Sequence, residues 1–239
     1  MKEKDFDELF QRFNNLNVIV IGDVMIDSYL WGHVDRISPE APVPIVAIDK
    51  KETRIGGAGN VALNVQALGA NPIIYTVIGN DNHGKLFKDL LTKQSLSDQG
   101  IIYSDSRNTT VKTRILSGRN QILRIDEEIT DPINSTEEES LLSRITQELE
   151  DGSIDVVIFE DYDKGVITKS LINAVIQKAN EKGIPITVDP KKKNFLAYRG
   201  ASLFKPNLKE IQEGMKTNVT PENIDKLEGL VAQLKADLE

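Results

Sequence analysis

Residues 53–64 read TRIGGAGNVALN and place three glycines within four positions, directly before a helical pattern. The apolar residues that follow recur at the spacing of one helix face up to Leu68, and Gly69 is typical of a helix C-terminus. Glycine lets a ligand approach the backbone closely, and the free amides at a helix start favour anions or hydroxyl oxygens. The stretch therefore predicts either the floor of a binding site, with Asn60 projecting from the first helical turn, or tight packing of a helix on a sheet.

The glycines do not match the common nucleotide-binding loops. A dinucleotide fingerprint needs Gly-x-Gly-x-x-Gly directly after an apolar strand, with an acidic residue about twenty positions later. Here the glycines of residues 56–59 have a different spacing, and the charged stretch 49–54 precedes them. The lysine-bearing Walker pattern is also missing from the sequence.

Short runs of β-branched and other apolar residues on both sides of this stretch predict a parallel sheet. The runs are continuous rather than alternating, as in strands covered on both faces, and they lie at 18–21, 73–78, 154–159 and 184–188. Helical patterns lie between them at 58–68, 141–149 and 171–179. This alternation predicts an open α/β sheet with helices on both sides.

Two further segments, 43–48 and 110–125, alternate apolar and polar residues. Such alternation predicts strands with one open face. We interpret them as a small β lid near residues 33–50 and 109–126, with an ordinary edge hairpin as the alternative.

Composition excludes several kinds of protein. The 239 residues carry a formal net charge of −8, with a pI of about 5.0, so a nucleic-acid partner is not expected. The absence of cysteine excludes disulfides and thiolate chemistry, and the two histidines have no second ligand at metal spacing. The charged N-terminus has no signal core, and no apolar run reaches the roughly 18 residues of a membrane span. We therefore expect a cytoplasmic protein without a membrane partner.

Polar residues follow four predicted strands, the runs at 18–21, 154–159 and 184–188 and a short strand at 202–205, at the end where a ligand of an open α/β sheet binds. Gly22-Asp23 ends the first strand, with Asp27 shortly after, and the other strand ends run into 160–165, 189–191 and 206–210. Each group alone is also typical of a helix cap or a solvated turn. Together they predict one polar site along the carboxyl edge of the sheet.

Four of these motifs, in this order, resemble the ribokinase-like (PfkB) family of sugar kinases. They are IGDVMID at 21–27, GGAGNVALN at 56–64, DPKK at 189–192 and PNLKE at 206–210. Three further stretches resemble the branch that phosphorylates D-glycero-β-D-manno-heptose 7-phosphate, the kinase half of bifunctional ADP-heptose synthases. These stretches are RISPEAPVPI at 36–45, EDYDKG at 160–165 and YRGASLFKPN at 198–207.

The resemblance covers nearly the whole chain and implies a three-layer α/β domain with a β lid. It also implies ATP-dependent phosphorylation of the anomeric hydroxyl of heptose 7-phosphate to the 1,7-bisphosphate, a precursor of the lipopolysaccharide core. The substrate-binding candidates that it implies are Asp27 for sugar hydroxyls, Gly56, Gly57 and Asn60 for the floor, and Asp161 and Lys164 nearby. The candidates for the distal phosphate are Lys112, Arg114 and Arg124, because guanidinium forks suit phosphate; the alternative is ordinary solvated strand charges.

The resemblance further implies a nucleotide side of the site that binds ATP and magnesium. Its candidates are Asp189, Asn207, Leu208, Lys209 and Glu210. Asn207 and Glu210 match the family's Asn-x-x-Glu element, and hard oxygens of this kind suit Mg²⁺, often through water. The resemblance also implies a homodimer that pairs through the lid strands.

One family element has no counterpart in the sequence. The family carries a Gly-Ala-Gly-Asp element whose aspartate is the general base, whereas Gly57–Gly59 here precedes Asn60. We therefore expect the base and the C-terminal part of the domain beyond Glu239, and little or no turnover by these 239 residues. A kinase for another sugar and a non-catalytic sugar-phosphate-binding module are the alternatives.

Overall fold

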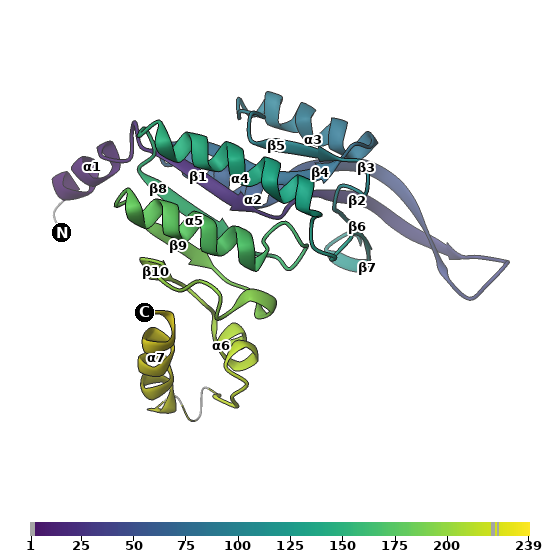
Figure 1. The fold of residues 1–239 in the computed structure, drawn as a ribbon. Helices are drawn as coiled ribbons and strands as arrows, with labels where there is room; N and C mark the ends of the chain where they lie inside the picture. Colours follow the sequence, from purple (N-terminus) through teal and green to yellow (C-terminus); the bar gives the residue numbers. More distant parts are fainter. Residues whose placement is uncertain (1–2, 221–222, 224) are drawn as a thin grey trace.

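A six-stranded parallel sheet forms the centre of the computed structural model, which describes residues 3–220, 223 and 225–239 (Figure 1). Its strands lie in the order β10-β9-β8-β1-β4-β5, and every neighbouring pair is parallel. The bounds are β1 (Asn17–Gly22), β4 (Asn71–Gly79), β5 (Ile101–Ser104), β8 (Val156–Glu160), β9 (Ile186–Asp189) and β10 (Leu203–Phe204). The predicted α/β fold is confirmed.

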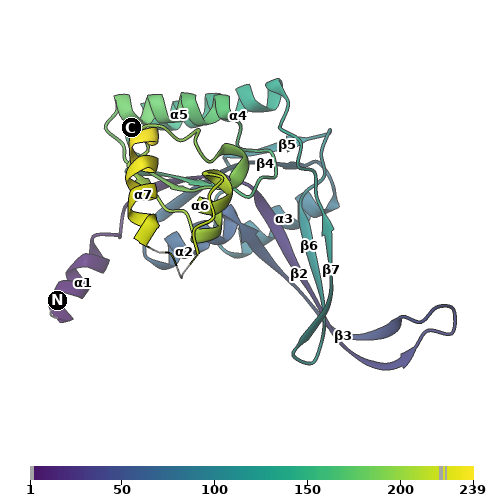
Figure 2. The ribbon, with the colours of Figure 1, turned by 90° about the horizontal axis from the view of Figure 1, so that it is seen from below.

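Helices cover both faces of this sheet, and the central strand shows why (Figures 1 and 2). Val18 and Val20 of β1 pack in one buried cluster with α2 (Ala58–Ala67) and α3 (Asn82–Lys93). Ile19 and Ile21 point the other way, into a cluster with α4 (Ser135–Glu150) and α5 (Lys169–Glu181). Because alternate side chains of a strand face opposite sides, a continuous apolar run supplies both cores.

The remaining helices lie at the ends of the chain and beside the β10 edge. α1 (Glu3–Gln11) extends away from the main body in both views (Figures 1 and 2). A short 3₁₀ helix, η1 (Lys192–Asn194), precedes β10, and α6 (Leu208–Gly214) and α7 (Asp225–Leu238) follow it. A small cluster of Phe195, Ile211 and Leu234 joins these elements. Among the described residues, none of the helices combines the length and apolar character needed to cross a bilayer.

A second sheet of four strands projects from one end of the first (Figure 2). Its order is β3-β2-β6-β7, with β2 (Val24–Ile37), β3 (Pro44–Gly57), β6 (Val111–Ser117) and β7 (Asn120–Glu127). The segments expected to form a lid, 33–50 and 109–126, lie in or beside these strands. β2 begins directly after β1, so Asp27, which the sequence placed shortly after the first strand, lies on a strand of the second sheet.

The two faces of this second sheet differ in chemistry, because directly paired residues project to the same side. The charged face includes Asp27, Tyr29, Lys50, Glu52, Arg54, Lys112, Arg114, Arg124 and Asp126. The apolar face carries Ile26, Ile55 and Val111 near the core and Leu30, Ile115, Leu123 and Ile125 farther out.

Candidate functional site

The glycine stretch lies directly beside Asp27, at the end of the charged face that adjoins the main sheet. A Cβ atom on Gly56 would lie 2.3 Å from Asp27 Oδ2, so only glycine leaves room for that carboxylate. Asp27 Oδ1 accepts a hydrogen bond from Arg114 Nη1 at 2.5 Å. Gly59 has a different role, since a Cβ there would meet the side chain of Ile55 at 2.3 Å. Gly59 thus fits the packing role that the sequence indicated, and the role of the glycines as the floor of a binding site stays a prediction.

Asp23 fixes the loop that follows β8 against this region. Its buried carboxylate accepts hydrogen bonds from the backbone N–H groups of Tyr162, Lys164 and Val166, at 2.9, 3.1 and 3.0 Å. Burial raises the pKa of Asp23 despite these donors. Arg107 Nη2 also donates to the carbonyl of Lys164, at 2.5 Å. These two side chains hold the 161–166 loop in place, and the sequence singled out neither for that role.

Two substrate candidates of this loop lie in different surroundings. The Lys164 ammonium donates to Glu128 Oε1 at 2.7 Å, and Lys112 Nζ lies 3.3 Å from Glu128 Oε2, so both lysines border the charged face. Asp161 is buried, and its Oδ2 accepts hydrogen bonds from Asn194 Nδ2 at 3.1 Å and the Tyr198 hydroxyl at 2.9 Å. The structure therefore places Asp161 inside the chain rather than on that face.

The arginines of the charged face are not equivalent. Arg124 is held by Asp126 in a bidentate pair, with N–O distances of 2.8 and 2.9 Å. Arg114 lies with its Cζ atom 5.3 Å from the centre of the Tyr29 ring, and Arg54 contacts the same ring at 5.2 Å. Tyr29 and Arg54 were not predicted. The alternation of Asp27 and Tyr29 is a sequence signal that places these two residues on one face, whereas Arg54 joins them only through the β2–β3 register.

A cluster of charged residues lies where β8 and β9 end. Glu160 and Asp189 are register partners there, and Lys205 Nζ and Lys191 Nζ lie 2.9 and 3.3 Å from the Asp189 carboxylate. Burial raises the pKa of Tyr162 most, and the charges of Glu160, Asp189 and Asp27 raise it further. Lys191 Nζ lies 5.6 Å from the centre of the Tyr162 ring, so Tyr162 borders this cluster of charges.

Glu160 makes the stability of this region dependent on pH. Burial, and then the charge of Asp189, raise its pKa from the ordinary 4.5 to about 7. The folded state thus holds a proton that the unfolded chain releases near pH 4.5. We expect the free energy of unfolding to fall by roughly 2 kcal/mol as the pH rises from 4.5 to 7. Urea denaturation across this pH range measures the free energy of unfolding. Glu160→Gln should flatten the profile, and an equally steep profile in that variant contradicts the assignment.

The predicted magnesium and nucleotide residues form the start of α6. Asn207 Oδ1 accepts the Glu210 N–H at 2.9 Å, and Glu210 Oε2 accepts the Asn207 N–H at 2.7 Å, which is a capping box. Glu210 Oε1 accepts from Lys191 at 2.5 Å. Both carboxylate oxygens are thus engaged, and the described residues contain no group of three or more metal-ligating side chains. Leu208 and Lys209 follow in the first turn, where Lys209 is mostly exposed.

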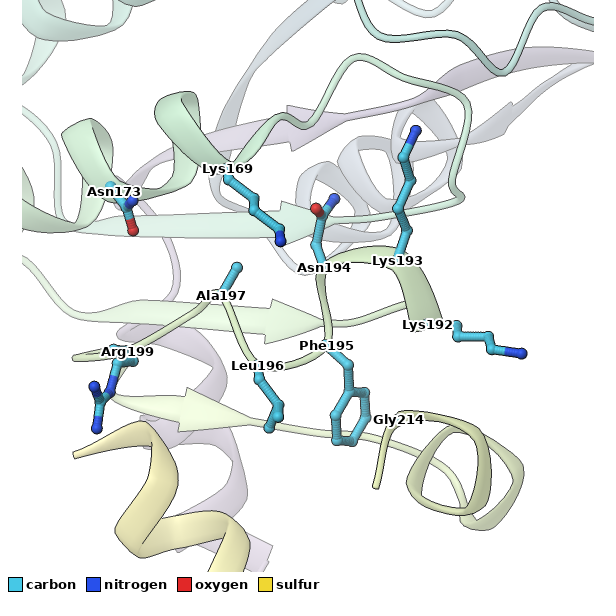
Figure 3. A pocket seen from close by; sticks show the side chains of 10 residues that line it. All are labelled: Lys169, Asn173, Lys192, Lys193, Asn194, Phe195, Leu196, Ala197, Arg199 and Gly214. Carbon is cyan, nitrogen blue, oxygen red and sulfur yellow. The ribbon is translucent and has the colours of Figure 1, made fainter. Parts of the chain in front are cut away.

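Asn60 lies exposed on the first turn of α2. It lines a cavity of about 380 Å³ together with Arg54, Leu63 and Gln94, between β3, α2 and α3. A second cavity of about 380 Å³ lies beside residues 192–199 (Figure 3). Lys169, Lys192, Lys193 and Arg199 surround it, but their charged ends point in different directions (Figure 3). The second cavity therefore does not present a converging set of groups.

Comparison with known proteins establishes the family. Residues 15–238 match the pfkB family of carbohydrate kinases. The chain belongs to this family. Bifunctional protein HldE of Geobacter metallireducens is 42% identical over 213 residues, which are 89% of this chain and 43% of the relative. HldE of Syntrophotalea carbinolica is 36% identical over the full 239 residues, or 48% of its own length. The chain thus spans less than half the length of these relatives. The predicted membership of the PfkB family is confirmed.

Solved structures show the same ribokinase-like fold. Phosphofructokinase-2 from Escherichia coli in complex with potassium superimposes with a TM-score of 0.68 at 18% identity, covering 93% of this chain and 70% of the other. Arabidopsis thaliana ribokinase, complexed with ribose and ATP, gives a TM-score of 0.62 at 15% identity, covering 94% and 69%. At these identities the likeness concerns the fold alone.

Proposed function

We propose that the chain binds D-glycero-β-D-manno-heptose 7-phosphate and provides the sugar site of a kinase that phosphorylates its anomeric hydroxyl. The observation that carries the proposal is Asp27, placed over Gly56 and bonded to Arg114 on a face rich in cations. A carboxylate suits sugar hydroxyls, and guanidinium groups suit a phosphate monoester. Identity of 36–42% to HldE proteins over most of the chain supports a heptose phosphate rather than another sugar.

In this proposal Asp27 orients the sugar above the backbone of Gly56 and Gly57, and Asn60 supplies an amide. Lys112, Arg114 and Arg124 are the predicted candidates for the distal phosphate, with Lys164 beside them. Phosphoryl transfer depends on positioning and charge stabilisation, so fixing both ends of the sugar is the contribution expected from this half of the site.

We further propose ATP as the phosphoryl donor, bound along Asp189, Asn207, Leu208, Lys209 and Glu210 with a magnesium ion. The capping box and Lys191 occupy both oxygens of Glu210, so direct metal coordination does not fit the arrangement present. Water-mediated contact is the form compatible with it.

The 239 residues contain no Gly-Ala-Gly-Asp element. We therefore propose that this polypeptide by itself binds the sugar phosphate but turns it over little. Robust ATP-dependent phosphorylation of heptose 7-phosphate by these residues alone contradicts that part of the proposal. The expected result is binding of the sugar phosphate without turnover. The alternative, a non-catalytic sugar-phosphate-binding module, predicts the same result.

Asp27→Ala tests the sugar site. Loss of charge-assisted hydrogen bonds of about 1.5–3 kcal/mol should weaken heptose 7-phosphate binding by roughly 10- to 150-fold in isothermal titration calorimetry. Asp98→Ala is the control and should bind unchanged, because Asp98 is a carboxylate paired with a cation, Lys88, outside the lid sheet. Ribose should not stabilise the wild-type chain thermally, whereas heptose 7-phosphate should. Unchanged affinity in Asp27→Ala removes Asp27 from the site.

We also propose that the lid pairs with a second copy through its apolar face. Leu123 and Ile125 there are 52% and 45% exposed, and Leu30 and Ile115 extend the same surface. Exposed apolar patches of this kind mark association surfaces. A sedimentation velocity profile of monomer at every concentration contradicts the dimer.

A further inference from the structure

We propose that Arg54 and Arg114, spaced by the ring of Tyr29, form the clamp that binds the phosphate of the sugar substrate. The inference rests on the proposed sugar-phosphate site and names the residues that determine its specificity for phosphorylated sugars. β2 lies between β3 and β6, so Arg54 and Arg114 approach the Tyr29 ring from opposite sides of its strand. Their Cζ atoms lie 5.2 and 5.3 Å from the ring centre. At such distances an aromatic face attracts and orients a guanidinium group.

The donors still available distinguish Arg54 from the other cations. A guanidinium has five N–H donors in a rigid fork. Arg124 has two of its nitrogens engaged by Asp126, and Lys112 lies between Asp126 and Glu128. Arg54 uses only Nε, which donates to Glu52 Oε1 at 2.5 Å. Neither terminal nitrogen of Arg54 has a hydrogen-bond partner among the described residues, so both can donate hydrogen bonds to the oxygens of one phosphate.

Charge on the face supports a dianionic ligand. The three cross-strand rows through Asp27, Tyr29 and Trp31 contain five cations and three carboxylates. The cations are Lys50, Arg54, Lys112, Arg114 and Arg124, and the carboxylates are Asp27, Glu52 and Asp126. The surplus of two positive charges stands on a chain whose formal net charge is −8. A phosphate monoester, which carries nearly two negative charges near neutral pH, complements this surplus.

The position of Asp27 relates the clamp to the sugar. Asp27 is paired across the sheet with Arg54, two residues before Tyr29 on the same face. Arg114 Nη1 is bonded to Asp27, which leaves its other terminal nitrogen and Nε for the ligand. A sugar held by Asp27 therefore has its phosphate end beside both arginines, while an unphosphorylated sugar has no group for them.

Calorimetry with D-glycero-D-manno-heptose 7-phosphate and with the same heptose lacking phosphate tests the clamp. Arg54→Gln should weaken the phosphorylated sugar about 10- to 100-fold and leave the unphosphorylated sugar unchanged. Arg54→Lys should recover only part of the loss, because an ammonium cannot form the fork. Tyr29→Leu should weaken the phosphorylated sugar as well, while Tyr29→Phe, which keeps the ring, should not.

Arg124→Gln is the comparison variant, and a smaller loss than that of Arg54→Gln is expected. The Arg54 side chain is 61% exposed, so its variants should fold, as circular dichroism can check. Wild-type binding of the sugar phosphate with unchanged affinity in Arg54→Gln overturns the clamp alone. Equal losses for both sugars also overturn it. Absence of sugar-phosphate binding by the wild type overturns the clamp together with the proposed function.

Discussion

Asp23→Ala is expected to destabilise the fold by about 4 kcal/mol and to abolish sugar binding. The Asp23 side chain accepts three backbone N–H groups of the 161–166 loop. Each lost hydrogen bond to a charged acceptor costs about 1.5–3 kcal/mol. The Val166 N–H would be left buried and unpaired, whereas the Tyr162 and Lys164 N–H groups are only partly buried. Relief of the burial that raises the pKa of Asp23 offsets part of the sum. Urea denaturation measures the stability, and calorimetry with heptose 7-phosphate measures the binding.

Asp155→Ala is the control for this experiment. Asp155 is exposed and accepts one backbone N–H, from Asn17 at 2.8 Å, so about 1 kcal/mol is expected for its loss. Because Tyr162 and Lys164 lie on the loop that Asp23 holds, binding should decline together with stability. Equal losses of stability in the two variants would show that Asp23 does not anchor the loop.

The sequence predicts the main sheet well because strands that are buried on both faces appear in the sequence as apolar runs without alternation. The runs 18–21 and 73–78 do not alternate, although Tyr75 and Thr76 interrupt the second, and each one became a strand between two helical layers. The helices at 58–68, 141–149 and 171–179 have apolar stripes for the same reason. Such apolar patterns can be recognised in the sequence without knowing which residues are neighbours in the fold.

The charged face of the second sheet could not be predicted from local apolar patterns. The 24–32 half of β2 mixes polar and apolar residues, and its strand is set by pairing with β3 and β6, which are distant in sequence. The contact of Arg54 with Tyr29 depends on that register, so the sequence offered no local signal for it. For Asn207 and Glu210 the sequence does give a local signal, but it has two interpretations. The same spacing fits both a capping box and a metal site.

Gly57→Ala is the second change with a large expected effect, a loss of about 3–5 kcal/mol in the free energy of unfolding. Gly57 has φ of 61° and ψ of −139°, a backbone conformation that is close to glycine-only. A Cβ there would also lie 2.3 Å from the carbonyl oxygen of Asp23. That oxygen accepts the Ala58 N–H at 3.0 Å, so relief of the clash would break the junction of β3 with α2.

Gly118→Ala separates the two causes, because Gly118 also has a positive φ, 59°, yet nothing lies within 4 Å of the position of its Cβ. Backbone strain alone should cost about 1 kcal/mol at that turn. Both variants can be compared by urea denaturation, with heptose 7-phosphate binding as a second readout. The excess loss in Gly57→Ala then measures the contact with Asp23 together with the strain of its ψ of −139°, and it should appear in binding as well, because Gly56 and Asp27 lie next to the same junction. If the two glycine variants lose the same stability, the close approach of Gly57 to Asp23 does not hold the site together.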